Sequence, residues 1–109
     1  MMFEEFQESI GDARLAVAYF SGPNCSVCHA IEPKLDGVML EFDDWKVVKI
    51  DAEESREVTG QALVMAVPTL LFFVDGDEVD RLSRSFSMAQ VRERLGHYTQ
   101  LTADDSGWD

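Results

Sequence analysis

Two cysteines three positions apart, Cys25 and Cys28, are the residues whose type and spacing could do redox chemistry. A disulfide is reduced when a thiolate attacks one of its sulfurs and a second, nearby thiol then displaces the substrate from the mixed disulfide. At a helix start, Cys25 would face unpaired backbone N–H groups and the positive end of the helix dipole, which both favour a thiolate. Cys28 would lie one turn deeper on the same helix face. We therefore expect Cys25 to attack and Cys28 to resolve.

Other roles for this pair remain open. Two buried, unreactive thiols are one alternative. Cys25 and Cys28 with His29 and His97 include the ligand types of zinc, but a structural zinc site normally takes a second close pair of ligands, and we find none. Residues 25–29 (CSVCH) also fit the attachment pattern of c-type haem, which is formed after export, and no export signal is visible. We expect His29 to face solvent and the domain to need no cofactor or metal.

Length and charge restrict the partners of the chain. Its 109 residues predict one domain over residues 1–101 and a mobile acidic tail over residues 102–109. The 21 acidic and 9 basic residues give a net charge of −12, which would repel nucleic acid and anionic membrane surfaces. No apolar run approaches the roughly 18 residues needed to cross a bilayer. We expect a cytoplasmic monomer that binds neither nucleic acid nor membrane.

The apolar pattern predicts helices and strands that alternate along the chain. Asp51 with Glu54, and Ser87 with Gln90, have the spacing of helix-capping pairs. Two strands joined by a full helix must run parallel, and the Asp-Gly-Asp sequence at 75–77 predicts a hairpin turn. The prediction is an α/β fold with a four-stranded mixed sheet, a parallel βαβ unit plus an antiparallel β-hairpin, flanked by helices. We expect strands over residues 15–20, 45–50, 69–74 and 78–84, and helices over residues 3–11, 25–42, 51–63 and 87–101.

This order of elements, with a C-x-x-C at a helix start and a proline before a hairpin, resembles the thioredoxin superfamily from about Leu15 to Leu95. Residues 21–35 (SGPNCSVCHAIEPKL) resemble the active-site segment of that family, and residues 49–51 (KID) and 67–70 (VPTL) resemble its next two landmarks. The resemblance implies a three-layer fold. It also implies exchange between the cysteine pair and disulfides of proteins or small molecules, with electrons supplied by a separate reductase.

The sequence also departs from the family pattern. Tyr19 stands where the family has a buried aspartate, and Val47 stands where the lysine that pairs with it would be. Asn24 replaces the tryptophan ahead of the first cysteine, the dipeptide between the cysteines is Ser-Val, and Arg84 replaces a glycine beside the substrate groove. We expect Tyr19 to be a core aromatic residue, because an ordinary tyrosine pKa of about 10 makes it a poor base at neutral pH.

The resemblance further implies a substrate groove around Pro68. In this reading Pro68 is a cis-proline that faces the cysteines, the backbone of Val67 binds an extended substrate segment, and Asn24 and Arg84 border the groove. A plainer reading makes Pro68 only the first residue of a strand. The alternative function is an interaction module with weak redox activity that binds a partner through the groove around Pro68. The departures at Tyr19 and Val47 favour this alternative, whereas the cysteine pair and Pro68 favour the oxidoreductase.

Overall fold

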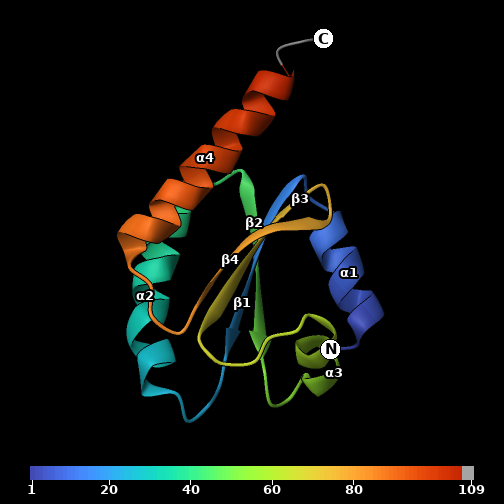
Figure 1. Cartoon of the computed structure of the whole chain (residues 1–109), viewed down its shortest axis with the longest axis vertical. Coiled ribbons are helices and arrows are strands. Elements are labelled where there is room, and N and C mark those ends of the chain that lie inside the picture. Colours follow the sequence, from blue (N-terminus) through green and yellow to red (C-terminus); the bar gives the residue numbers. More distant parts are fainter. Residues whose placement is uncertain (107–109) are drawn as a thin grey trace.

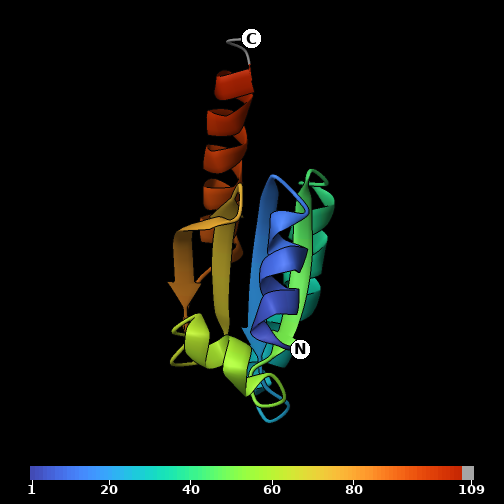
Figure 2. The same cartoon turned by 90° about the vertical axis from the view of Figure 1, so that its right-hand side faces the viewer.

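A mixed sheet of four strands lies between two pairs of helices in the computed structural model, which describes residues 1–106, with side chains through residue 103 (Figures 1 and 2). The strand order is β2-β1-β3-β4; β1 and β2 are parallel, and the other neighbours are antiparallel. This architecture confirms the predicted fold class. The elements are α1 (Phe3–Gly11), β1 (Leu15–Ser21), α2 (Ser26–Leu40), β2 (Trp45–Asp51), α3 (Arg56–Gln61), β3 (Thr69–Val74), β4 (Asp77–Ser83) and α4 (Met88–Ser106).

Each face of the sheet is covered by one pair of helices. In Figure 1, α2 and α4 lie to the left of the strands, and α1 and α3 lie to the right. The central strand β1 is buried on both faces, which explains why its sequence is a continuous apolar run instead of an alternating one. Its alternate side chains enter two separate cores: Leu15, Val17 and Tyr19 on the side of α2 and α4, and Ala16, Ala18 and Phe20 on the side of α1 and α3.

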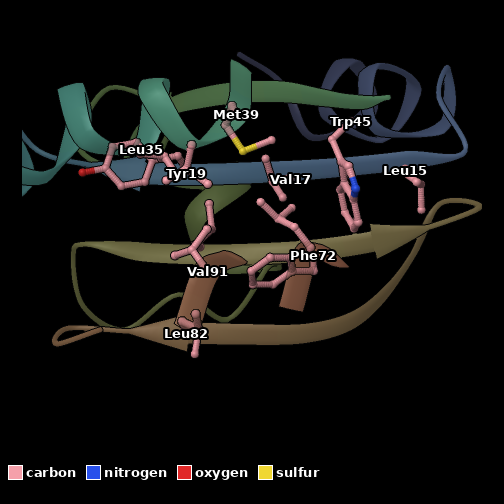
Figure 3. Close-up of a cluster of buried hydrophobic side chains, with 12 residues drawn as sticks. Leu15, Val17, Tyr19, Leu35, Met39, Trp45, Phe72, Leu82 and Val91 are labelled. Carbon is pink, nitrogen blue, oxygen red and sulfur yellow. The ribbon is translucent and has the colours of Figure 1, made fainter. Parts of the chain in front are cut away.

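The core beneath α2 and α4 fixes the helix that carries the cysteines. Leu35 and Met39 of α2 pack with Val17 and Tyr19 of β1, and Val91 of α4 closes the cluster from the other side (Figure 3). The ring of Trp45 meets that of Phe72 edge-on at 6.2 Å between centroids, in the same cluster. Because close-packed side chains resist displacement, α2 is held in one position over β1.

The helix boundaries agree with the sequence prediction to within one or two residues at most ends, and differ by more at the start of α3 and the end of α4. Asp51 Oδ1 accepts hydrogen bonds from the backbone N–H groups of Glu53 and Glu54, so it caps a turn, and α3 begins only at Arg56. At the other end of the chain, α4 continues to Ser106 instead of ending near residue 101. Residues 102–106 are therefore helical. The mobility expected of the tail stays a prediction, and its residues 107–109 lie outside the described residues.

The predicted cap of the last helix is correct. The backbone N–H of Ser87 donates to Gln90 Oε1 at 2.9 Å, and the Ser87 Oγ accepts from the backbone N–H of Gln90 at 3.1 Å. This reciprocal pair satisfies N–H groups that the first helical turn leaves unpaired. Among residues 1–106, no helix combines the length and apolar character needed to span a bilayer.

Candidate functional site

Cys25 and Cys28 lie where β1 gives way to α2, and a disulfide joins them with their Cα atoms 5.2 Å apart. Cys25 is the N-cap of α2 and has an extended backbone, and its Sγ accepts a hydrogen bond from the backbone N–H of Cys28 at 3.1 Å. Cys28 is fully buried, whereas Cys25 is partly exposed. One sulfur is therefore open to a partner molecule, and the other is shielded behind it.

The segment that ends in Pro68 lies against the loop that leads to this helix. The Val67–Pro68 peptide bond is cis, and Pro68 is buried immediately before β3. Val67 lies against the loop that carries the cysteines, since a Cβ placed on Gly22 would be 3.7 Å from Val67 Cγ2. Gly22 in turn accepts a hydrogen bond through its carbonyl oxygen from the backbone N–H of Cys25 at 3.3 Å. Two segments more than 40 residues apart along the chain are thus brought together where the two central strands, β1 and β3, meet one end of the sheet.

Arg81 of β4 holds the loop that leads to Val67. Its guanidinium donates to the backbone carbonyl oxygens of Ala62 and Leu63, each at 3.0 Å, and is itself paired with Glu78 at 2.6 Å. The planar guanidinium presents several donors at fixed angles, which lets one side chain bind two carbonyls and a carboxylate at once. Sequence reasoning missed Arg81, because nothing near it in the sequence indicates these partners.

Tyr19 of β1 contacts the first turn of α2 from the side that faces the sheet. Its side chain is fully buried, and its hydroxyl donates to the carbonyl oxygen of Cys28 at 3.0 Å. Burial raises the pKa of Tyr19 to about 12, with a further increase from the negative charge of Glu32 and a decrease from Lys49. The phenol is therefore neutral at physiological pH. Tyr19 is a core aromatic residue, as predicted, and its hydroxyl contacts the backbone of Cys28.

A charged group borders Tyr19 on the solvent side. Lys49 of β2, which is opposite Tyr19 in the strand register, forms ion pairs with Glu32 at 2.8 Å and with Asp36 at 2.9 Å. The hydrogen bond to Glu32, followed by that to Asp36, raises the pKa of the Lys49 ammonium. Glu32 follows Cys28 by four positions, so it lies on the same face of α2 one turn further on. That spacing is the sequence signal that indicates Glu32.

The remaining predicted site residues lie on the surface. Asn24 is exposed in the loop before Cys25, and Arg84 is exposed just after β4. His29 is exposed, and its Nε2 is 3.1 Å from the carbonyl oxygen of Pro23. The ring of His97 packs against Tyr98 on α4. Within the described part of the chain, no three His, Cys, Asp or Glu side chains are grouped so as to hold a metal ion.

Comparison with known proteins agrees with this geometry. The family model "Thioredoxin" matches residues 1–96. The chain is 38% identical over 88 residues to the thioredoxin-like protein YdfQ of Bacillus subtilis, which covers 81% of this chain and 79% of that protein. It is 40% identical over 67 residues to the thioredoxin of the same organism, covering 61% of this chain and 64% of that protein.

Solved structures lead to the same family. A mutant thioredoxin of Halobacterium salinarum superposes with a TM-score of 0.80 at 27% identity, over 88% of this chain and 84% of that one. Fasciola hepatica thioredoxin gives a TM-score of 0.80 at 29% identity, over 86% of this chain and 91% of that one. The sheet order, the cysteine pair at the start of α2 and these matches agree, and the chain belongs to the thioredoxin family.

Proposed function

We propose that this protein reduces disulfides of other molecules by cycling Cys25 and Cys28 between dithiol and disulfide. The observation that carries the proposal is the disulfide at the start of α2, in which Cys25 is partly exposed and Cys28 is fully buried. Val67 lies against Gly22, in the loop that leads to Cys25. Membership of the thioredoxin family supports thiol-disulfide exchange in general. Protein disulfides as substrates, a separate reductase as electron donor and a cytoplasmic location are parts of this proposal.

The first step of the proposed reaction is attack by Cys25. As the N-cap of α2, its sulfur receives the backbone N–H of Cys28 and lies at the positive end of the helix dipole, so a thiolate is stabilised there. The thiolate attacks one sulfur of the substrate disulfide, a mixed disulfide with Cys25 forms, and the other substrate sulfur leaves as a thiolate. An extended substrate segment lies along the backbone of Val67, which comes just before the start of β3.

The second step is resolution by Cys28. Cys28 gives up its proton, its thiolate attacks the sulfur of Cys25, and the remaining half of the substrate leaves as a thiolate. Two electrons pass from the protein to the substrate, and the disulfide seen in the structure is the product. A buried thiol resists ionisation, and Tyr19, with its raised pKa, is not a base for it at neutral pH. Resolution should therefore be the slower of the two steps.

Alkylation of the reduced protein tests the two assigned roles. A small alkylating reagent should label Cys25 much faster than Cys28, because only Cys25 is accessible. Peptide mapping of the first adduct by mass spectrometry gives the order. Labelling of Cys28 first, or equally slow labelling of both, would contradict the proposed roles.

Trapping of the mixed disulfide tests the reaction sequence. The Cys28→Ser variant should accumulate mixed disulfides with protein substrates, because the intermediate on Cys25 then lacks its internal exit. The matched control is Cys25→Ser, which retains one thiol but should trap nothing, since Cys28 is buried. Non-reducing gels reveal the adducts, and equal trapping by both variants would refute the assignment.

A second candidate function is an interaction module with weak redox activity that binds a partner through the groove around Pro68. The observation in its favour is the neutral Tyr19 phenol beneath Cys28, because it supplies no proton acceptor for resolution. Insulin reduction with a chemical reductant separates the two candidates. Catalytic turnover supports the oxidoreductase, whereas partner binding that survives in a Cys25→Ser, Cys28→Ser double variant, together with no turnover, supports the module.

A further inference from the structure

Arg84 has a backbone conformation that residues with a side chain rarely adopt. Its φ is +66°, in the left-handed region that favours glycine. A short hydrogen bond from its backbone N–H to the carbonyl oxygen of Pro68, at 2.7 Å, holds it there. Unfavourable backbone conformations that the surrounding structure maintains occur often at binding and catalytic sites. Arg84 is bonded to Pro68, which follows Val67, and Val67 lies against the loop that leads to Cys25. The exposed arginine side chain therefore starts close to that loop.

The charge of Arg84 is not neutralised within the described part of the chain. Most of the basic side chains form ion pairs with neighbouring carboxylates, namely those of Arg14, Lys46, Lys49, Arg81, Arg92 and Arg94. The exposed guanidinium of Arg84 has no such partner among the described residues. Lys34 and Arg56 also form no ion pair among the described residues, but Arg84 is the one of the three whose backbone is bonded to Pro68. In a chain of net charge −12, a cation without an ion pair at this place is a local exception to the acidic surface.

The strand register places Arg84 within reach of a molecule bound at Cys25. Ser83, the residue before Arg84, pairs with Thr69, and Thr69 pairs with Phe20 near the end of β1. Two strand spacings of about 4.8 Å separate these ends, and β1 and β4 both run toward the end of the molecule from which α2 starts (Figure 1). A long arginine side chain can cross part of that distance.

Acidic residues follow the other outer strand of the sheet. There β2 ends at Asp51, which is followed by the exposed Glu53 and Glu54. In the sheet order, β2 and β4 are the two outer strands, and β1, which leads to the cysteines, lies between them, so acidic residues follow one outer strand and Arg84 follows the other. A substrate that lies across the site therefore meets two different electrostatic environments.

We propose that Arg84 makes the site select disulfides that carry a negative charge close to the reacting sulfur, such as disulfides in acidic peptide segments. The inference rests on the proposed function and specifies its substrate class. The guanidinium binds the substrate carboxylate while the substrate is joined to Cys25, and it offsets the repulsion from the acidic surface. A contact between unit charges about 4 Å apart in water changes a rate or affinity by about fivefold, and salt screens it.

Single-turnover kinetics with three small disulfides test this inference. The protein is reduced and desalted, and its oxidation is followed with oxidised glutathione, which is anionic, hydroxyethyl disulfide, which is neutral, and cystamine, which is cationic. Arg84→Asn removes the charge with a residue that tolerates the left-handed region, and Arg84→Lys retains it. Lys34→Gln is the matched control, because Lys34 is exposed on α2 and its loss changes the net charge equally.

At low ionic strength, Arg84→Asn should lower the ratio of the rate with oxidised glutathione to the rate with hydroxyethyl disulfide by about fivefold. It should raise the corresponding ratio of the cystamine rate to the hydroxyethyl disulfide rate. Arg84→Lys should retain most of the wild-type glutathione ratio, and Lys34→Gln should leave it unchanged. Salt at 1 M should remove most of the difference between wild type and Arg84→Asn. An unchanged ratio in Arg84→Asn, or an equal fall in Lys34→Gln, overturns the inference. Failure of the wild-type protein to reduce even hydroxyethyl disulfide would instead refute the proposed function.

Discussion

Replacement of Tyr19 by phenylalanine should lower stability and leave the redox reaction intact. The variant loses the buried hydrogen bond from the phenol to the carbonyl oxygen of Cys28, 3.0 Å long, and retains the packing of the ring. A bond of this kind contributes about 1 kcal/mol to the free energy of unfolding. In a domain of this size that corresponds to a fall in melting temperature of about 4 to 8 °C.

The pH dependence gives a sharper test of the same side chain. The pKa of Tyr19 is about 12 in the folded protein, against about 10 in the unfolded chain. Because the folded pKa is the higher one, the stabilisation is complete below pH 10 and is lost as the pH rises toward 12. Two pKa units correspond to about 3 kcal/mol. Wild type should lose this amount as the pH rises through that window, in addition to the alkaline loss that it shares with Tyr19→Phe through Lys49 and Tyr98. The two stability curves should therefore cross near pH 11, at about the point where the Tyr19 contribution has fallen by 1 kcal/mol.

Chemical unfolding of the oxidised protein from pH 7 to 12 measures both effects without titrating thiols. The control is Tyr98→Phe. It removes a partly exposed hydroxyl that donates to Val79 O and Asp80 Oδ2, and it should retain the loss of stability at alkaline pH that is due to Tyr19. Insulin reduction at neutral pH completes the test. A tenfold loss of turnover in a folded Tyr19→Phe variant would refute our reasoning, because the hydroxyl would then take part in the ionisation of Cys28.

Three further predictions concern residues around the site and the core. Arg84→Gly should raise the free energy of unfolding by about 1 kcal/mol in denaturant melts, because glycine adopts a φ of +66° without strain. Arg81→Lys should speed hydrogen exchange in the loop before Val67 and lower the rate of insulin reduction severalfold, because an ammonium cannot reproduce the bonds to both carbonyls of that loop. Unchanged hydrogen exchange would show that these bonds do not hold the loop. Phe72→Ala should cost about 3 to 5 kcal/mol in denaturant melts, because Phe72 is fully buried against Trp45, and a loss below 1 kcal/mol would contradict that packing.

Local patterns in the sequence determined several features of this protein. The cysteine pair was placed correctly at a helix start, and the apolar run of β1 was correctly read as a buried strand. The capping pair of Ser87 and Gln90 was correct as well. Each of these features depends on residues a few positions apart, whose spacing decides by itself which backbone groups or faces they share. The same reasoning was wrong about Asp51, because its carboxylate caps a turn equally well.

Tertiary structure alone decided what surrounds the cysteines. The contacts of Tyr19 with Cys28, of Arg81 with Ala62, and of Arg84 with Pro68 join residues 9 to 19 positions apart, and each depends on strand register and on the placement of α2. The end of α4 was also set in this way: Thr102 is buried, and its hydroxyl donates to the carbonyl oxygen of Tyr98 in a helix that extends beyond the expected boundary. A sequence pattern specifies which face of an element is apolar. The partners of polar side chains, and thus the charge and proton chemistry of the site, are fixed only when the packed elements bring distant segments within hydrogen-bond distance.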